Sequence, residues 1–377
     1  MGDVVQEPLR VLHAIGSLNQ GGSQSFVMNL YRAMDRSLVQ FDFVIEHPGE
    51  LYHAEEIERL GGRVFELESL TSGNMLRYAR QWRDFFRAHD EWPIVHGHVR
   101  STGSIYLSIA KKYGMHVISH SHSTSECAGI KGGIKRILEY PLRFVADDYF
   151  ACSESSARWL FGNAVVDRGD VHIVPNAIDA SSFRYSDVVR AEMRASLGLG
   201  DEFVVGNIGR LSEPKNHPFL LDVFEEILRL RPDAKLLLAG DGELRRSIED
   251  SIEQRGVAAS VMMLGARGDV ASLYQAMDLF LMPSLYEGFP VALVEAQAAG
   301  LPAVVSNSVT DAADIVDGLI DRLSLDAPVD DWAQACVARA GSPRPDTTHD
   351  IVAAGYDAAE NAANLCSYYL SVGVRRA

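Results

Sequence analysis

Two carboxylates, Glu287 and Glu295, stand eight positions apart on either side of a Gly-Phe-Pro segment. Proline is favoured in the first turn of a helix, because the N–H that it lacks is not needed there, so a helix is expected over about 290–299. Backbone N–H groups at the start of such a helix can hold an anion. Glu295, more than a turn further along, could then reach a sugar hydroxyl. An acidic loop before an ordinary amphipathic helix would contain the same residues.

Two cations, Arg210 and Lys215, follow a strand expected at 203–209. The ligand cleft of a parallel sheet opens at the carboxyl ends of its strands. Cations at that position suit a diphosphate leaving group, because catalysis must stabilise the negative charge that develops on it. The alternative interpretation is a pair of solvated surface cations.

Gly21 and Gly22 lie between a strand expected at 10–15 and a helix expected at 25–34. Glycine lets the backbone approach a phosphate or a sugar closely, and the start of a helix adds positive potential. The loop does not have the G-x-G-x-x-G pattern, so a nicotinamide cofactor is poorly supported. Because glycine is common in turns, an ordinary loop would look the same.

Four histidines end two successive expected strands: His96 and His98 on the first, His120 and His122 on the second. Residues i and i+2 of a strand share a face, so each pair can project together. Two such pairs could form a metal site. Histidines that hydrogen-bond within a polar cleft would have the same spacing, and we favour that interpretation, with no bound metal.

The elements that must position these residues alternate between strands and helices. In the first half, strands are expected at 10–15, 41–45, 63–67, 94–96, 117–120, 148–152 and 171–175. The pattern restarts after Asp179, with strands at 203–209, 235–240, 261–264, 279–282 and 303–306. The alternation predicts an α/β protein built from βαβ units and parallel sheets. Two doubly wound halves could face one central cleft with the carboxyl ends of their strands.

Composition and charge limit the classes of function. A chain of 377 residues is too long for one hydrophobic core, and a net charge of −16 disfavours nucleic acid as a partner. Four scattered cysteines with no C-x-x-C pair argue against a disulfide framework or a cysteine zinc site. The polar N-terminus does not resemble a signal peptide, and no apolar run approaches the roughly 18 residues that span a bilayer. We expect a cytoplasmic protein, at most peripheral at the inner face of the membrane.

A basic amphipathic helix is expected over residues 131–144, where Lys131, Lys135, Arg136 and Arg143 interleave with apolar residues. Such a stretch can rest on an anionic membrane, which would suit an acceptor carried on a polyprenyl lipid. A surface helix with its apolar face on the core is the alternative.

The motifs together resemble those of retaining GT-B glycosyltransferases, in particular glycosyltransferase family four. The E-x7-E run at 287–295 resembles that family's signature, and further family-like stretches lie at 150–153, 174–179, 209–216, 238–242 and 264–270. The resemblance extends from about Arg10 to Leu325 and is to the branch that builds exopolysaccharide and capsule repeat units. It implies an acceptor-side Rossmann-like domain over 1–185 and a nucleotide-sugar-binding one over 186–352. The C-terminal helix, within 353–377, would cross back to the first domain.

The resemblance also assigns roles to residues. Glu287 would hydrogen-bond the donor sugar, and His122 would orient that sugar from the opposite domain. Arg210 and Lys215 would stabilise the departing diphosphate, and Glu295 would hold the ribose. The rest of the donor-binding set would lie near the phosphates, sugar or base, in part through backbone N–H groups: Gly21, Gly22, Ala266, Arg267, Gly288, Phe289 and Pro290.

The implied reaction transfers a hexose from a UDP- or GDP-sugar to a sugar or polyprenyl-linked acceptor, with retention at the anomeric carbon and without a metal. No carboxylate can be identified as a nucleophile for a double displacement, so the resemblance favours a front-face route. Two alternatives remain: a nucleotide-sugar epimerase on the same scaffold, which would turn over without an acceptor, and a non-catalytic nucleotide-sugar-binding protein.

Overall fold

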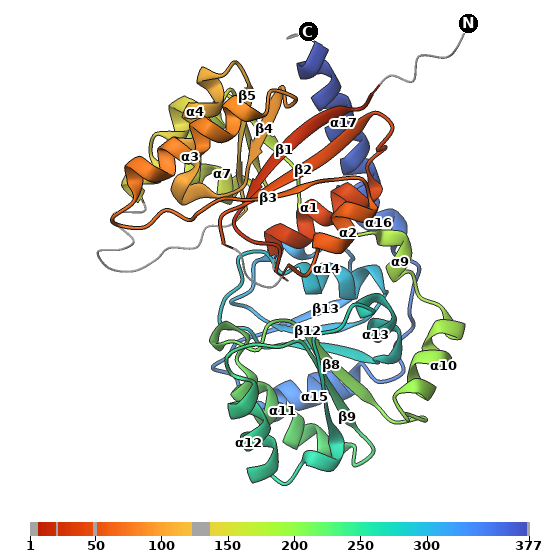
Figure 1. Ribbon diagram of the computed structural model, residues 1–377. Helices are drawn as coiled ribbons and strands as arrows, with labels where there is room; N and C mark the ends of the chain where they lie inside the picture. Colours follow the sequence, from red (N-terminus) through yellow and green to blue (C-terminus); the bar gives the residue numbers. More distant parts are fainter. Residues whose placement is uncertain (1–6, 20–21, 48–50, 123–135, 375–377) are drawn as a thin grey trace, which may run out of the picture. The chain divides into compact units, whose positions relative to one another are not determined.

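The computed structural model describes residues 7–19, 22–47, 51–122 and 136–374. The chain divides into two compact units (Figure 1). Unit 1 comprises Met1–Ile178 and Asp357–Ala377, and unit 2 comprises Asp179–Tyr356. Each unit contains one parallel sheet with helices on both faces, so the predicted α/β architecture with two doubly wound halves is confirmed.

Unit 1 has a seven-stranded sheet in the order β3-β2-β1-β4-β5-β6-β7. Its strands are β1 (Leu9–Ile15), β2 (Val39–Ile45), β3 (Val64–Glu66), β4 (Ile94–Gly97), β5 (His116–Ser121), β6 (Asp148–Ala151) and β7 (Val171–Ile173). The helices with fully described bounds are α1 (Gly22–Ala33), α2 (Ala54–Arg59), α3 (Met75–Ala88), α4 (Arg100–Lys112), α6 (Leu142–Val145), α7 (Glu154–Phe161), α8 (Asn163–Asp167) and α17 (Ala358–Val374). All seven strands expected in this half are present, and the winding direction of the sheet changes between β1 and β4.

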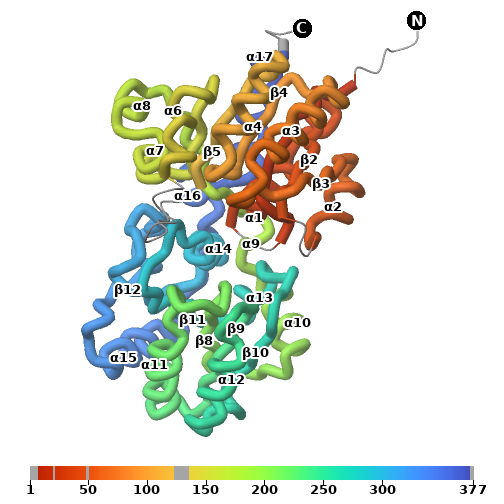
Figure 2. The backbone as a smooth tube through the Cα atoms, turned by 60° about the vertical axis from the view of Figure 1, so that its left-hand side comes forward, coloured from red at the N-terminus to blue at the C-terminus, as the bar shows by residue number. Residues whose placement is uncertain are grey.

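The central strands of unit 1 are buried on both faces, as parallel strands between two helical layers must be. One face carries α1 and α17, whose Tyr31 and Tyr369 pack with Phe41 of β2. The other face carries α3 and α4, which lie side by side (Figure 2), and there Trp82 stacks on Tyr106. The C-terminal helix α17 therefore packs on unit 1, as the resemblance implied.

Unit 2 has a six-stranded sheet in the order β10-β9-β8-β11-β12-β13. Its strands are β8 (Val204–Ile208), β9 (Lys235–Ala239), β10 (Val261–Gly265), β11 (Leu279–Met282), β12 (Ala303–Ser306) and β13 (Ile320–Leu323). Its helices are α9 (Ala180–Phe183), α10 (Asp187–Ser196), η1 (Glu213–Lys215), α11 (His217–Leu230), α12 (Arg245–Gln254), η2 (Ala258–Ser260), α13 (Val270–Ala276), α14 (Val291–Ala298), η3 (Asp311–Ala313), α15 (Val329–Ala338) and α16 (Thr348–Ala353). The sequence predicted five strands here and missed β13, because this short edge strand carries an Asp-Arg pair instead of an apolar run.

The single helix expected over 131–144 is not continuous in its described part. Residues 136–139 are helical, Tyr140 and Pro141 form a turn, and α6 starts again at Leu142. Proline disfavours a helical conformation in the residue before it and has no N–H to donate, which explains the break. Residues 131–135 lie outside the described part. Among the described helices, none combines the length and the apolar character needed to cross a membrane.

Candidate active site

In unit 2, the loops that follow β8 and β11 bring Lys215 and Glu287 together. The Lys215 Nζ lies 2.8 Å from Glu287 Oε1, and the Ser284 hydroxyl donates to the same oxygen at 2.7 Å. The two charged side chains are only 15% and 11% exposed, so their ion pair is largely shielded from water. These strands are neighbours at the point where the sheet changes winding direction, the usual ligand position in such sheets.

Backbone conformation holds these two loops against each other. Asn216 is the non-glycine residue with positive φ (55°) among those described, a conformation that asparagine tolerates better than most residues. Its Nδ2 donates to the Pro283 carbonyl at 3.1 Å. In addition, the Leu285 N–H donates to the Pro214 carbonyl at 2.8 Å. The position of Lys215 relative to Glu287 is therefore fixed by two hydrogen bonds between the loops.

Glycine is required where the β8 and β9 loops touch. Gly240 has φ of 141°, and a Cβ built on it would lie 1.9 Å from the carbonyl oxygen of Gly209. A Cβ on Gly209 itself would lie 3.0 Å from Lys215 Cε. Larger residues at these positions would push the loop that carries Arg210 and Lys215 away from the sheet.

Glu295 lies in α14 and accepts a hydrogen bond from the Tyr274 hydroxyl at 3.0 Å. The same hydroxyl contacts the Ala292 carbonyl at 2.9 Å. Burial raises the pKa of Glu295 to about 7, and the Tyr274 hydrogen bond and the Lys215 charge only partly oppose that shift. Near neutral pH this carboxyl therefore exchanges readily between a charged acceptor and a neutral group.

The turn before α14 supplies fewer donors than the sequence analysis assumed. The N–H groups of Gly288 and Phe289 donate to no described residue, so they remain available to an anion. Pro290 has no N–H, so its expected role as a backbone donor is wrong. It instead caps α14, which starts at Val291. The Phe289 ring stacks on Tyr356 at 5.4 Å between ring centroids, which anchors the turn.

The remaining predicted residues of unit 2 lie in loops at the same end of the sheet. Arg210 is 73% exposed and pairs with Glu243 at 3.1 Å. Ala266 and Arg267 follow β10, where Arg267 forms a two-point ion pair with Asp269, with contacts of 2.8 and 2.6 Å. Both arginines are thus paired with a neighbouring carboxylate, but Arg210 is the more exposed of the two.

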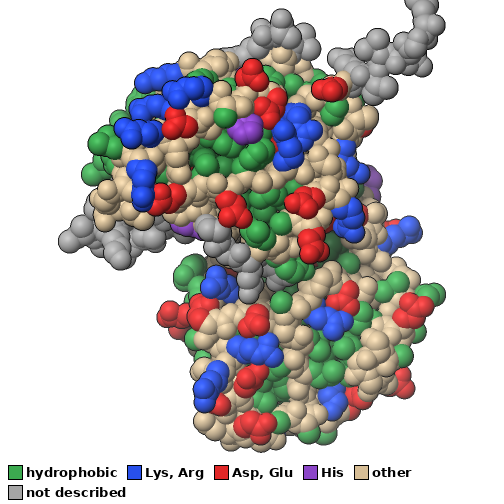
Figure 3. All heavy atoms as spheres, in the orientation of Figure 1, with side chains coloured by type: hydrophobic (Ala, Val, Ile, Leu, Met, Phe, Trp, Pro, Cys, Tyr) green, Lys and Arg blue, Asp and Glu red, His purple; other side chains and the backbone are tan. Residues whose placement is uncertain are grey.

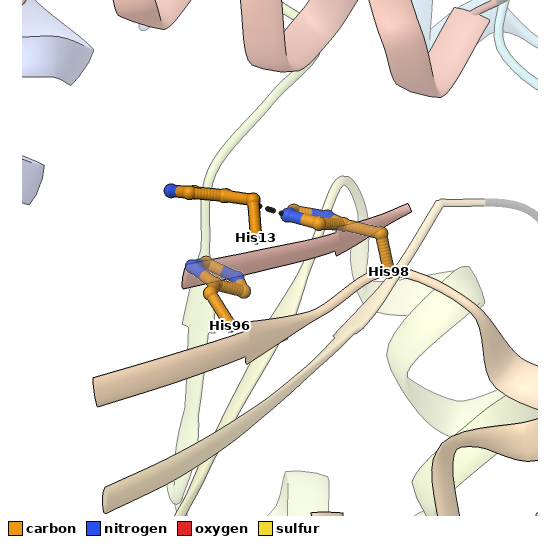
Figure 4. A group of neighbouring side chains, drawn as sticks. All are labelled: His13, His96 and His98. Atoms are coloured by element: carbon orange, nitrogen blue, oxygen red, sulfur yellow. Dashed lines mark hydrogen bonds between the residues drawn. The ribbon is translucent and has the colours of Figure 1, made fainter. Parts of the chain in front are cut away.

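Unit 1 presents a different group, which we call the histidine cluster; it consists of five side chains: His13, His96, His98, His120 and His122. They lie where β1, β4 and β5 end, at the change of winding direction of that sheet. His13 and His96 are register partners on adjacent strands. Figure 4 shows these two rings with His98, which follows β4.

The cluster contains two hydrogen-bonded chains. In the first, His13 Nδ1 lies 3.0 Å from His98 Nε2, and His98 Nδ1 lies 2.8 Å from His122 Nε2. In the second, the Tyr369 hydroxyl contacts His96 Nδ1 at 2.5 Å, and His96 Nε2 lies 3.0 Å from His120 Nδ1. The rings of the two chains stack on each other. The ring centroids of His120 and His122 are 4.2 Å apart, and their ring planes are inclined by 12°.

All five imidazoles are neutral at physiological pH. Burial lowers the pKa of each, and for His122 the nearby Arg100 charge adds to the effect and brings the pKa to about 3. The pKa values of His13, His96, His98 and His120 are lowered well below the usual value, first by burial and then by neighbouring histidines. Neutral imidazoles can bind metals as well as donate and accept hydrogen bonds.

A metal fits this cluster less well than its composition suggests. Two sets have three ligand nitrogens within 4.8 Å of one another: His13, His96 and His98, and His98, His120 and His122. A tetrahedral zinc needs these nitrogens to aim at one point about 2.0–2.1 Å away. In each set, however, two members already aim at each other in a hydrogen bond. The rings of His96 and His98 also stack, with their centroids 4.5 Å apart and their planes inclined by 16°, so their nitrogens do not point toward a common centre.

Sequence reasoning missed several members of these sites. Ser284, which bonds Glu287, and Tyr274, which bonds Glu295, belong to no recognised motif. His13 could have been found, because it lies inside the first expected strand at the same end as the other pairs. Gly22 begins α1, and a Cβ on it would meet no atom within 4 Å, so open space borders Gly22 itself. Gly21 lies outside the described residues.

Comparison with known proteins assigns the family. The model for Glycosyltransferase Family 4 matches residues 20–182, and the model for Glycosyl transferases group 1 matches residues 189–336. EpsF of Bacillus subtilis (strain 168), which is named as a glycosyltransferase, is 38% identical over 369 residues that cover 96% of both chains. The chain belongs to the glycosyltransferases.

Two further matches to this glycosyltransferase have lower sequence identity. The UDP-Gal:alpha-D-GlcNAc-diphosphoundecaprenol alpha-1,3-galactosyltransferase of Escherichia coli is 27% identical over 58% of each chain. The crystal structure of HepE from Anabaena in complex with UDP-glucose has a TM-score of 0.70 and 18% identity, and covers 97% of this chain and 98% of HepE. At that identity the likeness concerns the fold, and the GT-B fold is confirmed.

Proposed function

We propose that this glycosyltransferase transfers a hexose from a UDP- or GDP-sugar to a sugar or polyprenyl-linked acceptor, with retention at the anomeric carbon, in exopolysaccharide or capsule biosynthesis. The shielded Lys215–Glu287 pair at the switch point of unit 2 is the observation that carries the proposal. In this pair, Lys215 would provide a cation for the leaving diphosphate, and the adjacent Glu287 would provide a carboxylate for the sugar hydroxyls. The similarity to EpsF, the E. coli galactosyltransferase and the fold of HepE supports a nucleotide-sugar donor.

In this proposal unit 2 binds the nucleoside diphosphate. Arg210 and Lys215 neutralise the diphosphate, and the unbonded N–H groups of Gly288 and Phe289 donate to its oxygens. Glu295 accepts from the ribose hydroxyls, with Tyr274 holding the carboxyl in place. The loop of Ala266 and Arg267 borders the base.

The proposed transfer breaks the bond between the anomeric carbon and the diphosphate oxygen and forms one to the acceptor oxygen on the same face. The acceptor proton passes to an oxygen of the leaving phosphate. Glu287 orients sugar hydroxyls: Lys215 and Ser284 both bind its Oε1, while its Oε2 accepts from no described residue. His122 donates a hydrogen bond to the sugar, and no resident metal is required.

The test is a transfer assay with a panel of UDP- and GDP-hexoses and polyprenyl-diphosphate-linked sugars, with and without EDTA. We expect acceptor-dependent release of one nucleoside diphosphate, unchanged by EDTA, and a product whose anomeric NMR coupling matches that of the donor. Sugar isomerisation without an acceptor would identify an epimerase instead. A product with inverted configuration would contradict retention.

We also propose that the segment after residue 135 touches a membrane surface. Ile137, Tyr140 and Phe144 are 73%, 56% and 71% exposed, and Arg136 and Arg143 lie among them. Helix α3, which packs on the same helix α4 as α6 does, adds four exposed arginines, and Figure 3 shows Lys and Arg side chains on the face of unit 1 that carries α3. Exposed apolar side chains with cations in the same segment are typical of peripheral binding to anionic lipid.

Vesicle flotation tests the membrane contact. Wild-type protein should float with vesicles that contain anionic lipid, and the Ile137→Ser/Phe144→Ser double variant should lose most of that binding. Leu230→Ser is the matched control, because Leu230 is 51% exposed but lies in unit 2. Equal flotation of the double variant and wild type would overturn the proposed contact without affecting the proposed transfer.

A further inference from the structure

The first hydrogen-bonded chain of the histidine cluster, His13–His98–His122, can donate its hydrogen bonds in only one of two directions. Both ring nitrogens of His98 are engaged, one by His13 at 3.0 Å and the other by His122 at 2.8 Å. A neutral imidazole has one N–H donor and one acceptor nitrogen. His98 must therefore donate at one end and accept at the other, and the chain has only two possible directions.

The two directions differ in where they leave an unpaired N–H. If His13 donates to His98, then His98 donates to His122, and the His122 proton lies on Nδ1. In the opposite direction, the unpaired N–H lies on Nε2 of His13. Both atoms are buried and lack a hydrogen-bond partner among the described residues, so their surroundings decide between the directions.

The surroundings of His13 disfavour an unpaired donor there. His13 is 1% exposed, and its ring lies 4.0 Å from Phe41 and 5.7 Å from Phe43, centroid to centroid. The nearby acid, Asp42, is already paired with Arg10, Arg63 and Trp92. His122, by contrast, is only partly buried and lies just after the end of β5, where a bound ligand can accept from an otherwise unpaired N–H. The lone pair, not the proton, therefore belongs on Nε2 of His13.

The second chain does not decide between its two directions on these grounds. If the Tyr369 hydroxyl donates to His96 Nδ1, the unpaired proton lies on His120 Nε2, which is buried and has no partner among the described residues. In the opposite direction the unpaired proton lies on the Tyr369 hydroxyl, which is buried as well. The tautomer of His122 therefore follows from the first chain alone.

We propose that His13 and His98 are positioning residues that hold His122 as the tautomer with its proton on Nδ1, so that His122 is a fixed hydrogen-bond donor to an oxygen of the transferred sugar. The sugar contact rests on the proposed function, whereas the tautomer does not. The Nε2 of His122 is occupied as the acceptor for His98. His122 therefore cannot take a proton from the acceptor hydroxyl, and its part in the reaction is binding and orientation.

The tautomer can be measured without a substrate. We would label the histidines with ¹⁵N, record long-range ¹H–¹⁵N correlations from pH 6 to 8, and assign His122 by the loss of its signals in His122→Gln. The expected result is a protonated Nδ1, an unprotonated Nε2 and no titration in this range. A proton on Nε2, or rapid averaging of the two tautomers, would overturn the proposal.

A variant separates positioning from general stability. His98→Phe keeps a ring at the centre of the stack but removes both hydrogen bonds. His122 should then average between tautomers, and kcat/KM for the donor sugar should fall about tenfold, the usual scale for one hydrogen bond of orientation. Binding of UDP or GDP alone should not change. His172→Phe is the control, because His172 stacks on Phe150 outside the two chains.

The results of these experiments separate the positioning role of His13 and His98 from the proposed transfer function. A fixed Nδ1 tautomer in a protein without transfer activity would sustain the positioning role and remove the proposed function. Transfer activity that is unchanged in folded His98→Phe would overturn the positioning role alone. Zinc retained at one equivalent through gel filtration, with the ¹⁵N signals of His98, His120 and His122 shifted together, would also overturn it, because these nitrogens would be metal ligands.

Discussion

The site in unit 2 and the histidine cluster in unit 1 occupy equivalent positions in two similar sheets but differ in charge. In unit 2, a shielded ammonium and carboxylate lie 2.8 Å apart, beside a second carboxyl whose pKa is raised to about 7. In unit 1, five imidazoles are held neutral by burial. In the proposed reaction, the charged groups would hold the diphosphate, which gains charge, and the neutral directional donors would orient the sugar, which does not.

The difference shows how the same parallel-sheet architecture can carry a site that responds to ligand charge and a site that responds to ligand orientation. A charged pair responds to a change in ligand charge, because its energy depends on the whole local field. A chain of neutral hydrogen bonds responds to the direction of a ligand lone pair and is insensitive to charge. The four predictions below test this contrast, beginning with the largest expected effect.

Acid should unfold unit 1 before unit 2. A histidine that is neutral when folded and takes up a proton with a pKa near 6.5 when unfolded destabilises the protein as pH falls below that value. Each such group contributes about 1.4 kcal/mol per pH unit, so the five of the cluster contribute at most about 7 kcal/mol per pH unit to the free energy of unfolding.

Hydrogen exchange by mass spectrometry at pH 7 and pH 5 measures this effect by region. Peptides of β1, β4 and β5 should lose protection at pH 5, while those of β8 and β11 keep it. In unit 2 the comparable group is His217, whose pKa burial lowers to about 4. Equal loss in both units, or none in unit 1, would contradict the neutral state assigned to the cluster.

Removing the Glu287 carboxylate should nearly abolish transfer. Glu287→Ala should lower kcat by about 10²–10³, the scale for a preorganised polar group at the reacting centre. Nucleoside diphosphate affinity should be kept or should rise, because Lys215 loses the carboxylate that competes for its charge. Steady-state kinetics and titration calorimetry measure the two quantities.

The matched control is Glu249→Ala, which removes an exposed carboxylate paired with Arg245 in the same unit. Surface ion pairs contribute little, so its transfer rate should stay within about twofold of wild type. A Glu287→Ala enzyme with normal transfer would show that the site is wrongly assigned.

Nucleotide affinity should rise with pH through the titration of Glu295. With a pKa of about 7 in the free protein, the ionised fraction grows about tenfold between pH 6 and pH 8. If ribose hydroxyls donate to the carboxylate, the dissociation constant should fall by up to that factor over this range. Glu295→Gln should flatten the profile, and Tyr274→Phe should move its midpoint to higher pH by removing a bond that favours the carboxylate. A pH profile that is the same in Glu295→Gln would exclude the ribose contact.

Much of this could be predicted from sequence, because parallel sheets have a strong local signal. All seven strands of unit 1 and five of the six in unit 2 were expected from alternating β-rich and helical runs. The edge strand β13 was missed for lack of an apolar run. The helix expected at 131–144 was wrong because Pro141 breaks it within the described residues.

The site was less predictable than the fold, because its contacts join residues far apart in the sequence. Lys215 and Glu287 were both selected, but nothing in their spacing showed that they pair with each other. Tyr274 and Ser284 act through single hydroxyl contacts that leave no pattern. The histidine pairs were visible, whereas their joining into chains depends on the strand order β1-β4-β5, which sequence alone did not give.

Titration calorimetry of UDP, GDP and ADP with wild type, Arg210→Ala, Lys215→Ala and His98→Phe tests the central claim most directly. We expect saturable binding of UDP or GDP to wild type, a loss of at least about tenfold in affinity in each unit 2 variant, and unchanged affinity in His98→Phe. That result would assign the diphosphate to the charged site and leave the neutral cluster to the sugar. Binding that persists in both unit 2 variants, or fails in His98→Phe, would contradict this division of roles.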